Sequence, residues 1–267
     1  MKILFLGDLL GRSGREAVID QVPMLRKKWD LDCVIVNGEN AAHGFGITAK
    51  ICKELYEAGV DCITTGNHVW DQRELLSYID RDNKVLRPLN FPENTPGQGA
   101  SVIQTPAGKI LVMNVMGRVY MDAMDDPFAA VNKVLERHQL GRDVKAVVLD
   151  IHAEANSEKM AMGHFCDGRV SLVVGTHTHV PTADLQILSG GTAYQTDAGM
   201  CGSYDSVIGM DKDVPIMRFT RKFSIDRLRP ADGDVTICGL RIETDDATGL
   251  CINAEPVRIG GLLRQTA

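Results

Sequence analysis

The sequence predicts an α/β fold with mixed β-sheets, folded as one domain over residues 1–267. In the first half, short apolar runs rich in β-branched residues alternate with helical patterns, and such alternation is typical of parallel sheets. The second half is richer in strands and contains hairpin signals, which add antiparallel pairs. No long Pro- or Ser-rich linker, block of like charges or internal repeat marks a domain boundary. We therefore expect a single domain that contains two sheets.

Three pairs of a strand and a helix are predicted in the first half. The strands are expected over residues 3–6, 33–36 and 62–65, and the helices after Ser13, over 48–58 and over 72–79. Two of these helix starts have the capping-box spacing, in which a short polar side chain and a Glu three residues later satisfy free backbone amides. The two pairs are Ser13 with Glu16 and Asp71 with Glu74.

The second half begins with a predicted hairpin, because strands over residues 101–104 and 109–115 flank a Pro-Ala-Gly turn. A helix is then expected over 127–138, with Pro at its first position. The remaining strands are expected over 145–149, 172–174, 185–188, 235–243 and 251–259. Glycine turns follow 185–188 and 235–243, so antiparallel pairs should make the sheets mixed.

The composition excludes several classes of protein. Lys and Arg total 29 against 35 Asp and Glu, so the formal net charge is −6. This charge argues against a uniformly basic nucleic-acid-binding surface, although it leaves room for a local basic groove. Hydrophobic residues make up 44% and charged residues 24%, which are the proportions of a globular protein rather than of a disordered chain.

The start of the chain does not resemble a secretory signal, because the apolar run in MKILFLGD is too short and lacks a small-residue cleavage site. No stretch of about 18 apolar residues is present to span a bilayer. We therefore expect a cytoplasmic protein with no membrane partner. The seven cysteines include no C-x-x-C pair, and several lie in apolar strand-like runs, which indicates reduced thiols that pack as small hydrophobic groups.

Potential metal ligands follow five of the strand-like runs. In a parallel α/β sheet the carboxyl ends of the strands share one edge, so side chains that are distant in the sequence meet there. Glycines precede the first three groups of ligands, and they permit the sharp turns and close backbone approach of a crowded site. The candidate residues, in chain order, are Asp8, Glu39 with Asn40, Asn67 with His68, His152, and His177 with His179.

This set combines carboxylate, amide and imidazole groups, which suit transition metals such as Fe, Mn or Zn better than an all-oxygen calcium site. Its size favours two ions. Two divalent ions would outweigh the negative charges of Asp8 and Glu39, so the site would attract a phosphate anion. Two ions roughly 3.5–4 Å apart can hold a bridging hydroxide and bind phosphoryl oxygens during in-line attack. The residues therefore predict hydrolysis of a phosphoester without a Ser or Cys nucleophile.

The order of these motifs resembles that of the calcineurin-like metallophosphoesterases. The variants GDLLGRSGR, NGENAA, GNHVWD, DIHAEANSEK and GTHTHVPTAD are similar to the bacterial YmdB-type branch, which is associated with 2′,3′-cyclic nucleotide phosphodiesterase activity. The resemblance covers most of the chain, and five motifs in the same order are much more specific than any one of them. It implies a four-layer α/β/β/α sandwich with two mixed sheets and a dinuclear site, often of iron or manganese.

The resemblance also implies a role for each candidate residue. One ion would be held by Asp8, Glu39, Asn40 and His179, and the other by Glu39, Asn67, His152 and His177. Glu39 would bridge the ions, and His68 would be the general acid. The usual D-x-H start of the superfamily reads DLL here, and its GDxxD carboxylate is replaced by Glu39 followed by Asn40. A histidine of the first metal site is thus absent, and Asn40 would supply a neutral oxygen instead.

Several further residues allow two interpretations each. Asp150 either orients a ligand histidine or makes a hydrogen bond at the strand end. Asp71 is expected to cap a helix, with support of His68 as the alternative. Trp70 either stacks on a base or, as we expect, packs under the loop of His68. Arg12 either contacts a substrate phosphate or lies at a solvated helix start.

Two segments are also open to alternative interpretations. The basic residues between Arg218 and Arg229 would suit the guidance of RNA ends, but their alternation with Phe219, Phe223 and Ile225 favours a solvated strand face. The Gly-rich polar loop over residues 196–206 is compatible with a wall of the substrate pocket or with a subunit contact in a homo-oligomer.

These observations together predict a metal-dependent phosphodiesterase. The expected substrate is a cyclic nucleotide, such as a 2′,3′-cyclic nucleoside monophosphate, or the cyclic-phosphate end of an RNA. A metal-bridging hydroxide would attack, and His68 would protonate the leaving ribose oxygen. The expected ions are two Fe or Mn, with Zn as the alternative. The competing functions are a phosphomonoesterase or nuclease on the same metals and a regulatory scaffold that binds a nucleotide without turnover.

Overall fold

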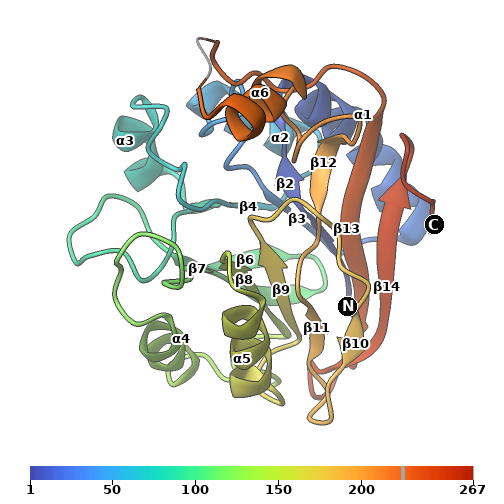
Figure 1. The fold of residues 1–267 in the computed structure, drawn as a ribbon. Coiled ribbons are helices and arrows are strands. Elements are labelled where there is room, and N and C mark those ends of the chain that lie inside the picture. The colour runs from blue at the N-terminus through green and yellow to red at the C-terminus, as the bar shows by residue number, and fades with distance from the viewer. Residues whose placement is uncertain (224–225, 267) are drawn as a thin grey trace.

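The computed structural model describes residues 1–223 and 226–266. These residues form two β-sheets that pack face to face, with helices over the outer face of each sheet (Figure 1). The layers therefore follow the order helix, sheet, sheet, helix. The predicted α/β fold with two mixed sheets is confirmed.

The first sheet is built from eight strands, namely β1 (Lys2–Leu6), β2 (Asp8–Leu9), β3 (Cys33–Asn37), β4 (Cys62–Thr64), β5 (Val85–Leu86), β12 (Met200–Ser203), β13 (Val235–Thr244) and β14 (Cys251–Ile259). Their order is β2, β12, β13, β1, β3, β4 and β5, and β14 pairs with β13. The strands β1, β3, β4 and β5 are parallel, whereas β13 is antiparallel to β1. The sheet therefore contains strands from both the N-terminal and the C-terminal part of the chain.

The second sheet contains β6 (Ala100–Thr105), β7 (Gly108–Met116), β8 (Ala146–His152), β9 (Leu172–Thr176), β10 (Gln186–Ile187) and β11 (Ala193–Gln195). Their order is β10, β11, β9, β8, β7 and β6. The predicted hairpin is present as β6 and β7, and β7, β8 and β9 are parallel. Strands β7 to β9 consequently direct their carboxyl ends to the same edge.

The side chains of a strand alternate between two cores. In β1, Ile3 and Phe5 belong to the core between the sheets, whereas Leu4 and Leu6 pack in the core beneath the helices. A strand that is buried on both faces has a continuous apolar sequence, because neither face needs polar residues. This burial explains why the apolar runs identified the central strands correctly.

Six α-helices complete the described part of the chain: α1 (Gly11–Trp29), α2 (Ala49–Glu57), α3 (Leu75–Tyr78), α4 (Pro127–Leu135), α5 (Asn156–Cys166) and α6 (Asp213–Arg221). Helices α1 and α2 cover the first sheet, and α4 and α5 cover the second. None of the described helices is long and apolar enough to cross a lipid bilayer. The seven cysteines are buried free thiols, as the sequence predicted.

Both predicted capping boxes are wrong. Helix α1 already begins at Gly11 and lacks a side-chain cap, and the Ser13 hydroxyl instead lies 3.5 Å from the Ala231 carbonyl oxygen. The helix expected over 72–79 shrinks to α3 and a 3₁₀ turn at Ile79–Arg81. The Asp71 carboxylate contacts a His68 ring nitrogen rather than capping a helix. Tertiary contacts therefore override the local capping signals.

The basic segment between Arg218 and Arg229 is not the strand that we predicted. Its first part is the end of helix α6, and a left-handed Lys222 follows the helix. Phe219 and Phe223 are strongly exposed, and Ile225 lies outside the described residues. The alternation of basic and apolar residues therefore does not reflect a strand face here.

Candidate metal centre

All eight predicted site residues lie at or just beyond the carboxyl ends of strands. Asp8 begins β2 two residues after β1, and His152 is the last residue of β8. The other six follow three parallel strands, with Glu39 and Asn40 after β3, Asn67 and His68 after β4, and His177 and His179 after β9. The two sheets thus contribute to one shared edge, as expected for parallel α/β sheets.

Two groups of potential metal ligands share Glu39. Glu39, His152 and His177 each offer an atom within 4.8 Å of the others, and the same holds for Asp8, Glu39 and His179. A carboxylate has two oxygens, so one side chain can serve both groups. This arrangement provides Asp, Glu and His groups for metal binding at the predicted edge.

His152 is the most densely contacted member of the site. Its Nε2 atom lies 3.0 Å from Glu39 Oε1, 3.0 Å from Asn67 Oδ1 and 3.1 Å from His177 Nδ1. Four atoms with lone pairs cannot approach so closely unless a proton or a cation lies among them. Burial disfavours the charged imidazole, but the Glu39 carboxylate outweighs burial and raises the pKa of His152 to about 9. The raised pKa favours a proton on Nε2, and a bound cation would replace that proton.

Two oxygen atoms at the site are buried without a hydrogen-bond partner among the described residues. They are Asp8 Oδ1 and Asn40 Oδ1. The Asn40 amide nitrogen donates to the Gly44 carbonyl, so the amide oxygen is the atom left free. Burial also raises the pKa of Asp8 to about 7, against the opposing effect of nearby histidines. Leaving such acceptors unpaired is costly, and cation binding at these oxygens would remove the cost.

A hydrogen-bond chain fixes the orientation of His152. The Thr176 hydroxyl donates to Asp150 Oδ1 over 2.7 Å, so its oxygen is free to accept from His152 Nδ1 at 2.9 Å. With one proton held on Nδ1, Nε2 is the nitrogen that faces the other candidate ligands and that would bind a cation after losing its own proton. Asp150 is wholly buried and acts on His152 through Thr176 rather than by direct contact. Sequence reasoning identified Asp150 but missed Thr176.

Asp150 also connects the two sheets. Its Oδ2 atom accepts from Thr64 Oγ1 at 2.5 Å and from Asn37 Nδ2 at 3.0 Å. Thr64 and Asn37 belong to the first sheet, whereas Asp150 and Thr176 belong to the second. The halves of the site are therefore held together by buried hydrogen bonds just below it.

The loop that carries His177 and His179 does not continue strand β9. Both residues have positive φ angles, 96° and 65°. Asp197 holds the residue between them, because its carboxylate accepts from the Thr178 backbone amide at 3.1 Å and from the Thr178 hydroxyl at 2.7 Å. The Lys159 ammonium group donates to the same carboxylate at 2.8 Å, and both charged side chains are fully buried.

Sequence reasoning missed Asp197 and Lys159. The available signals were a carboxylate at the end of the strand-like run AYQTD and a lysine at helical spacing from Met162 and Cys166.

The two histidines of this loop present different ring nitrogens to the site. His179 Nδ1 donates to the Ile208 carbonyl over 2.7 Å, so Nε2 is free and lies 3.9 Å from Asp8 Oδ1. His177 directs Nδ1 toward His152. Burial, aided by the charge of His152, lowers the pKa of His177 to about 3, which keeps its imidazole neutral. Neutral imidazole is the form that binds metal ions.

His68 lies beside the two groups of potential ligands and belongs to neither. Its backbone amide donates to Glu39 Oε2 over 3.2 Å, and its Nδ1 atom lies 2.8 Å from Asp71 Oδ2. The alternative role of Asp71, support of His68, is therefore present. Gly66 permits this crowding, since a Cβ atom there would lie 2.3 Å from Glu39 Oε2 and from His152 Nε2.

The remaining candidates lie outside this cluster of contacts. Trp70 packs against Phe91 with ring centroids 6.3 Å apart, which agrees with the expected packing role. Arg12 is exposed and pairs with Glu16 over 2.6 Å. Residues 196–206 contribute to the wall behind the site, because the Gly199 carbonyl accepts from the Asp8 backbone amide.

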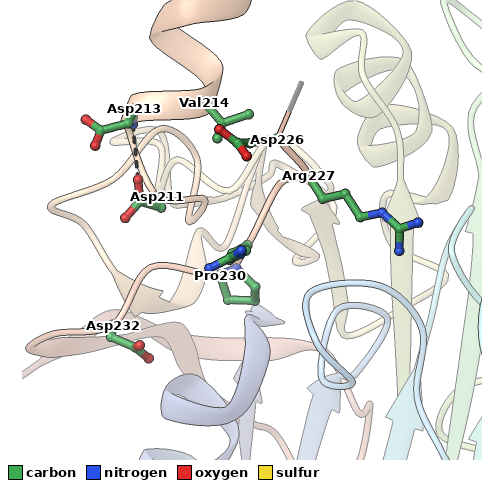
Figure 2. Close-up of a pocket in the computed structure, with 8 residues that line it drawn as sticks. Asp211, Asp213, Val214, Asp226, Arg227, Pro230 and Asp232 are labelled. Atoms are coloured by element: carbon green, nitrogen blue, oxygen red, sulfur yellow. Dashed lines mark hydrogen bonds between the residues drawn. The ribbon is translucent and has the colours of Figure 1, made fainter. Parts of the chain in front are cut away.

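A separate pocket of about 480 Å³ lies beside α6. Figure 2 shows that its acidic side chains do not converge, since Asp232 lies apart from Asp211 and Asp213 and the Arg227 side chain extends away from that pair. None of the eight predicted site residues lines this pocket. It therefore differs in both place and chemistry from the candidate metal centre.

In this chain two mixed sheets lie between helices, and carboxylates, amides and imidazoles meet at their common edge. These features define the metallophosphoesterase class of α/β proteins. A crystal structure of a hypothetical protein from Thermus thermophilus has a TM-score of 0.91 and 39% identity, and the match covers 98% of this chain and 100% of that one. The crystal structure of a novel phosphatase from Mycoplasma pneumoniae has a TM-score of 0.90 and 36% identity, covering 97% and 93%. The chain belongs to the family of YmdB-like proteins, whose sequence model matches residues 4–257.

A curated relative extends this comparison to an enzyme. It is the Bacillus subtilis (strain 168) protein named 2′,3′-cyclic-nucleotide 2′-phosphodiesterase, which is 44% identical over 259 residues, or 97% of each chain. A second relative, a putative phosphatase/phosphodiesterase of Mycoplasma pneumoniae, is 38% identical and covers 97% of this chain and 93% of its own. The resemblance stated from the sequence motifs is confirmed at the level of the family.

Proposed function

We propose that this chain is a metal-dependent phosphodiesterase that hydrolyses 2′,3′-cyclic nucleotides. The observation that carries the proposal is the pair of potential metal-binding groups that share Glu39. This site occurs in a chain that is 44% identical, over nearly its full length, to a relative named for that activity. A cationic centre of this kind attracts a phosphodiester anion.

Each ion is assigned a set of ligands in this proposal. The first is held by Asp8, Glu39, Asn40 and His179, and the second by Glu39, Asn67, His152 and His177. The unpartnered oxygens of Asp8 and Asn40 support the first set, and the close contacts of His152 Nε2 support the second. Bound ions would supply an activated hydroxide and would compensate charge on the phosphoryl oxygens. The mixed oxygen and nitrogen donors favour Fe or Mn, with Zn as the alternative.

The residues of the chain itself complete the reaction. Asp71 accepts from His68 Nδ1, so Nε2 is the ring nitrogen that can present a proton to the leaving ribose oxygen. The chain from Asp150 through Thr176 keeps the Nε2 atom of His152 directed into the site. The Asp197 carboxylate holds the loop of His177 and His179. These contacts preorganise the site before substrate arrives.

Substrate competition tests the proposal. Purified protein, supplied with Mn²⁺, is assayed with 2′,3′-cyclic AMP, with a nucleoside monophosphate and with bis(p-nitrophenyl) phosphate. We expect the two diesters to be hydrolysed faster than the monoester, and an RNA with a cyclic-phosphate end extends the comparison. The Glu39→Gln protein serves as the control for contaminating enzymes, because it should lose the activity.

Two outcomes would contradict the proposal. Faster release of phosphate from the monoester would assign the phosphatase function that the name of the Mycoplasma pneumoniae structure suggests. Nucleotide binding without any turnover by metal-loaded protein would indicate a regulatory scaffold.

A further inference from the structure

Tyr120 combines two features that are unfavourable in a free surface loop. Its side chain is 91% exposed, although an aromatic ring gains free energy by burial. Its φ angle is 61°, in the left-handed region that a residue other than glycine enters at a cost. Strained residues of this kind cluster where a side chain meets a ligand.

The position of Tyr120 follows from the end of strand β7. Met116, the last residue of β7, pairs with His152, and the next amide, that of Gly117, donates to the His152 carbonyl over 3.0 Å. Tyr120 is three residues farther on, so its Cα atom lies at most about 11 Å from that of Gly117. In Figure 1 the segment between β7 and α4 runs along the left of the view, beyond the end of β7. Tyr120 therefore belongs to the loop that starts beside His152, at the strand end where the candidate metal centre lies.

The loop around Tyr120 is anchored on both sides. The backbone amides of Arg118 and Val119 donate to the Glu158 carboxylate at 3.0 and 3.2 Å. After Tyr120, the side chains of Met121 and Met124 pack against the core of the first sheet. The exposed ring is thus held on an ordered loop, which reduces the conformational entropy that a bound ligand must overcome.

The chemistry of the substrate suggests what the ring contacts. Ions held by the potential metal ligands would engage the phosphate of a cyclic nucleotide, and none of these ligands would contact its base. Bases stack on aromatic side chains in nucleic-acid sites, and every base offers a face for such stacking. Trp70 and Phe45 are less available, because they contact Phe91 and His68 respectively. Tyr120 is the more exposed of these aromatic residues.

We propose that Tyr120 forms a nucleobase-binding subsite, in which its ring stacks on the base of the cyclic nucleotide while the phosphate lies at the candidate metal centre. This inference rests on the proposed function and adds a second point of recognition to it. Stacking tolerates different bases, so the subsite distinguishes nucleotides from cyclic phosphates that have no base.

The test uses Tyr120→Gly and Tyr120→Phe. Glycine adopts a φ of 61° without strain, so Tyr120→Gly should unfold at the same temperature as the parent protein or at a higher one. Its KM for 2′,3′-cyclic AMP should rise between about fivefold and about 150-fold, the range expected for loss of one stacked base. The KM for ribose 2′,3′-cyclic phosphate, which has no base, should stay unchanged. Tyr120→Phe keeps the ring and should behave like the parent on both substrates.

Asp30→Gly provides a matched control. Asp30 also has a left-handed φ, 52°, and it ends helix α1 away from the candidate metal centre. This variant removes the same kind of backbone strain, and its KM values should match those of the parent. Equal KM changes for both substrates in Tyr120→Gly would overturn the subsite. A changed oligomeric state of Tyr120→Gly in sedimentation, with unchanged KM values, would also overturn it and would assign Tyr120 to a contact between copies.

Binding measurements separate this inference from the proposed function. Titration calorimetry with 2′,3′-cyclic AMP should show weaker binding to Tyr120→Gly by the same factor as the rise in KM. Loss of binding on mutation in a protein that turns over no substrate would support the subsite and contradict the proposed activity. Turnover with binding that is independent of Tyr120 would support the activity and overturn the subsite.

Discussion

The His68 ring lies next to the candidate ligands, and its two nitrogens have different roles in our proposal. Asp71 lies 2.8 Å from Nδ1, and the backbone amide of His68 donates to Glu39. These contacts fix the residue against the proposed bridging carboxylate and reserve Nε2 for proton transfer. Phe45 contacts the ring edge-on at a centroid distance of 5.1 Å, which further restricts its rotation.

His68→Ala should retain both metal ions but turn over 2′,3′-cyclic AMP at least about a hundredfold more slowly, because a positioned general acid typically contributes roughly 10²- to 10⁴-fold. A nitrophenyl ester leaves readily without a proton, so its hydrolysis should slow much less. Elemental analysis and steady-state kinetics on the same preparation check both parts. Loss of an ion, or equal slowing of the two substrates, would show that His68 is a ligand or a phosphate-positioning group.

At the scale of single residues, the sequence predicted the polar groups that end a strand and the supporting residue Asp150, but it missed the supporting residues Thr176, Asp197 and Lys159. Asp8, Glu39 and His152 stand out because each follows an apolar run. Lys159 and Asp197 do not, because their relation depends on two segments that meet only in the fold. Asn40 was predicted as a ligand, and its free oxygen is consistent with that role, which stays a prediction.

Among the secondary-structure elements, helix α5 supports the site through a buried charge. Its Lys159 crosses to Asp197, which in turn holds Thr178 between the two loop histidines. An unpaired charge would be very unfavourable there, because water cannot reach either group. The pair therefore couples the packing of α5 to the position of the ligand loop.

Lys159→Met should lower the free energy of unfolding by about 3–5 kcal/mol, which is the usual cost of leaving one charge of a buried ion pair without its partner. Adding Asp197→Asn to the same chain should restore part of this loss, because the remaining amide carries no charge. Lys212→Met removes a comparable but exposed pair with Asp205 and should hardly change stability. Denaturant unfolding of the variants checks these expectations. A stabilised Lys159→Met protein would mean that the ion pair is not needed for stability.

The success of the predictions for individual elements depended on how their residues are buried. Strand β14 matches its predicted bounds, Cys251–Ile259, and Thr48 caps α2 through a bond from the Ile51 amide. Helix α5 was not predicted, because its buried face includes Glu158 and Lys159 and so has no clear apolar stripe. The short β2 was also missed, since its two residues form a strand only by pairing with β12.

At the scale of the whole molecule, the candidate metal centre joins the two sheets. Asp8, Glu39 and Asn67 come from the first sheet and its loops, whereas His152 and His177 come from the second. An ion bound to both sets stabilises the folded state relative to the unfolded chain, which has no assembled site.

Removal of metal should therefore lower the unfolding temperature of the whole domain. Each site saturated at about 100 times its dissociation constant contributes about 2.7 kcal/mol. Calorimetry before and after chelation checks the effect, and the parent should contain close to two ions per chain.

Glu39→Gln should lose both ions, whereas Asn40→Ala should keep the second. Equal metal loss from the two variants would show that Glu39 is not the bridge.

The strand order of the first sheet also bears on how the protein is made. Strand β1 lies between β3 and β13, and β2, which begins with Asp8, pairs with β12. Strands from the C-terminal part of the chain therefore complete the surroundings of the first two strands. During translation the N-terminal half emerges with one edge of β1 unpaired, a state prone to association with other chains. The ribosome must release residues up to about Thr244 before that edge is covered. Asp8 therefore reaches its final surroundings only after β12 and β13 have emerged.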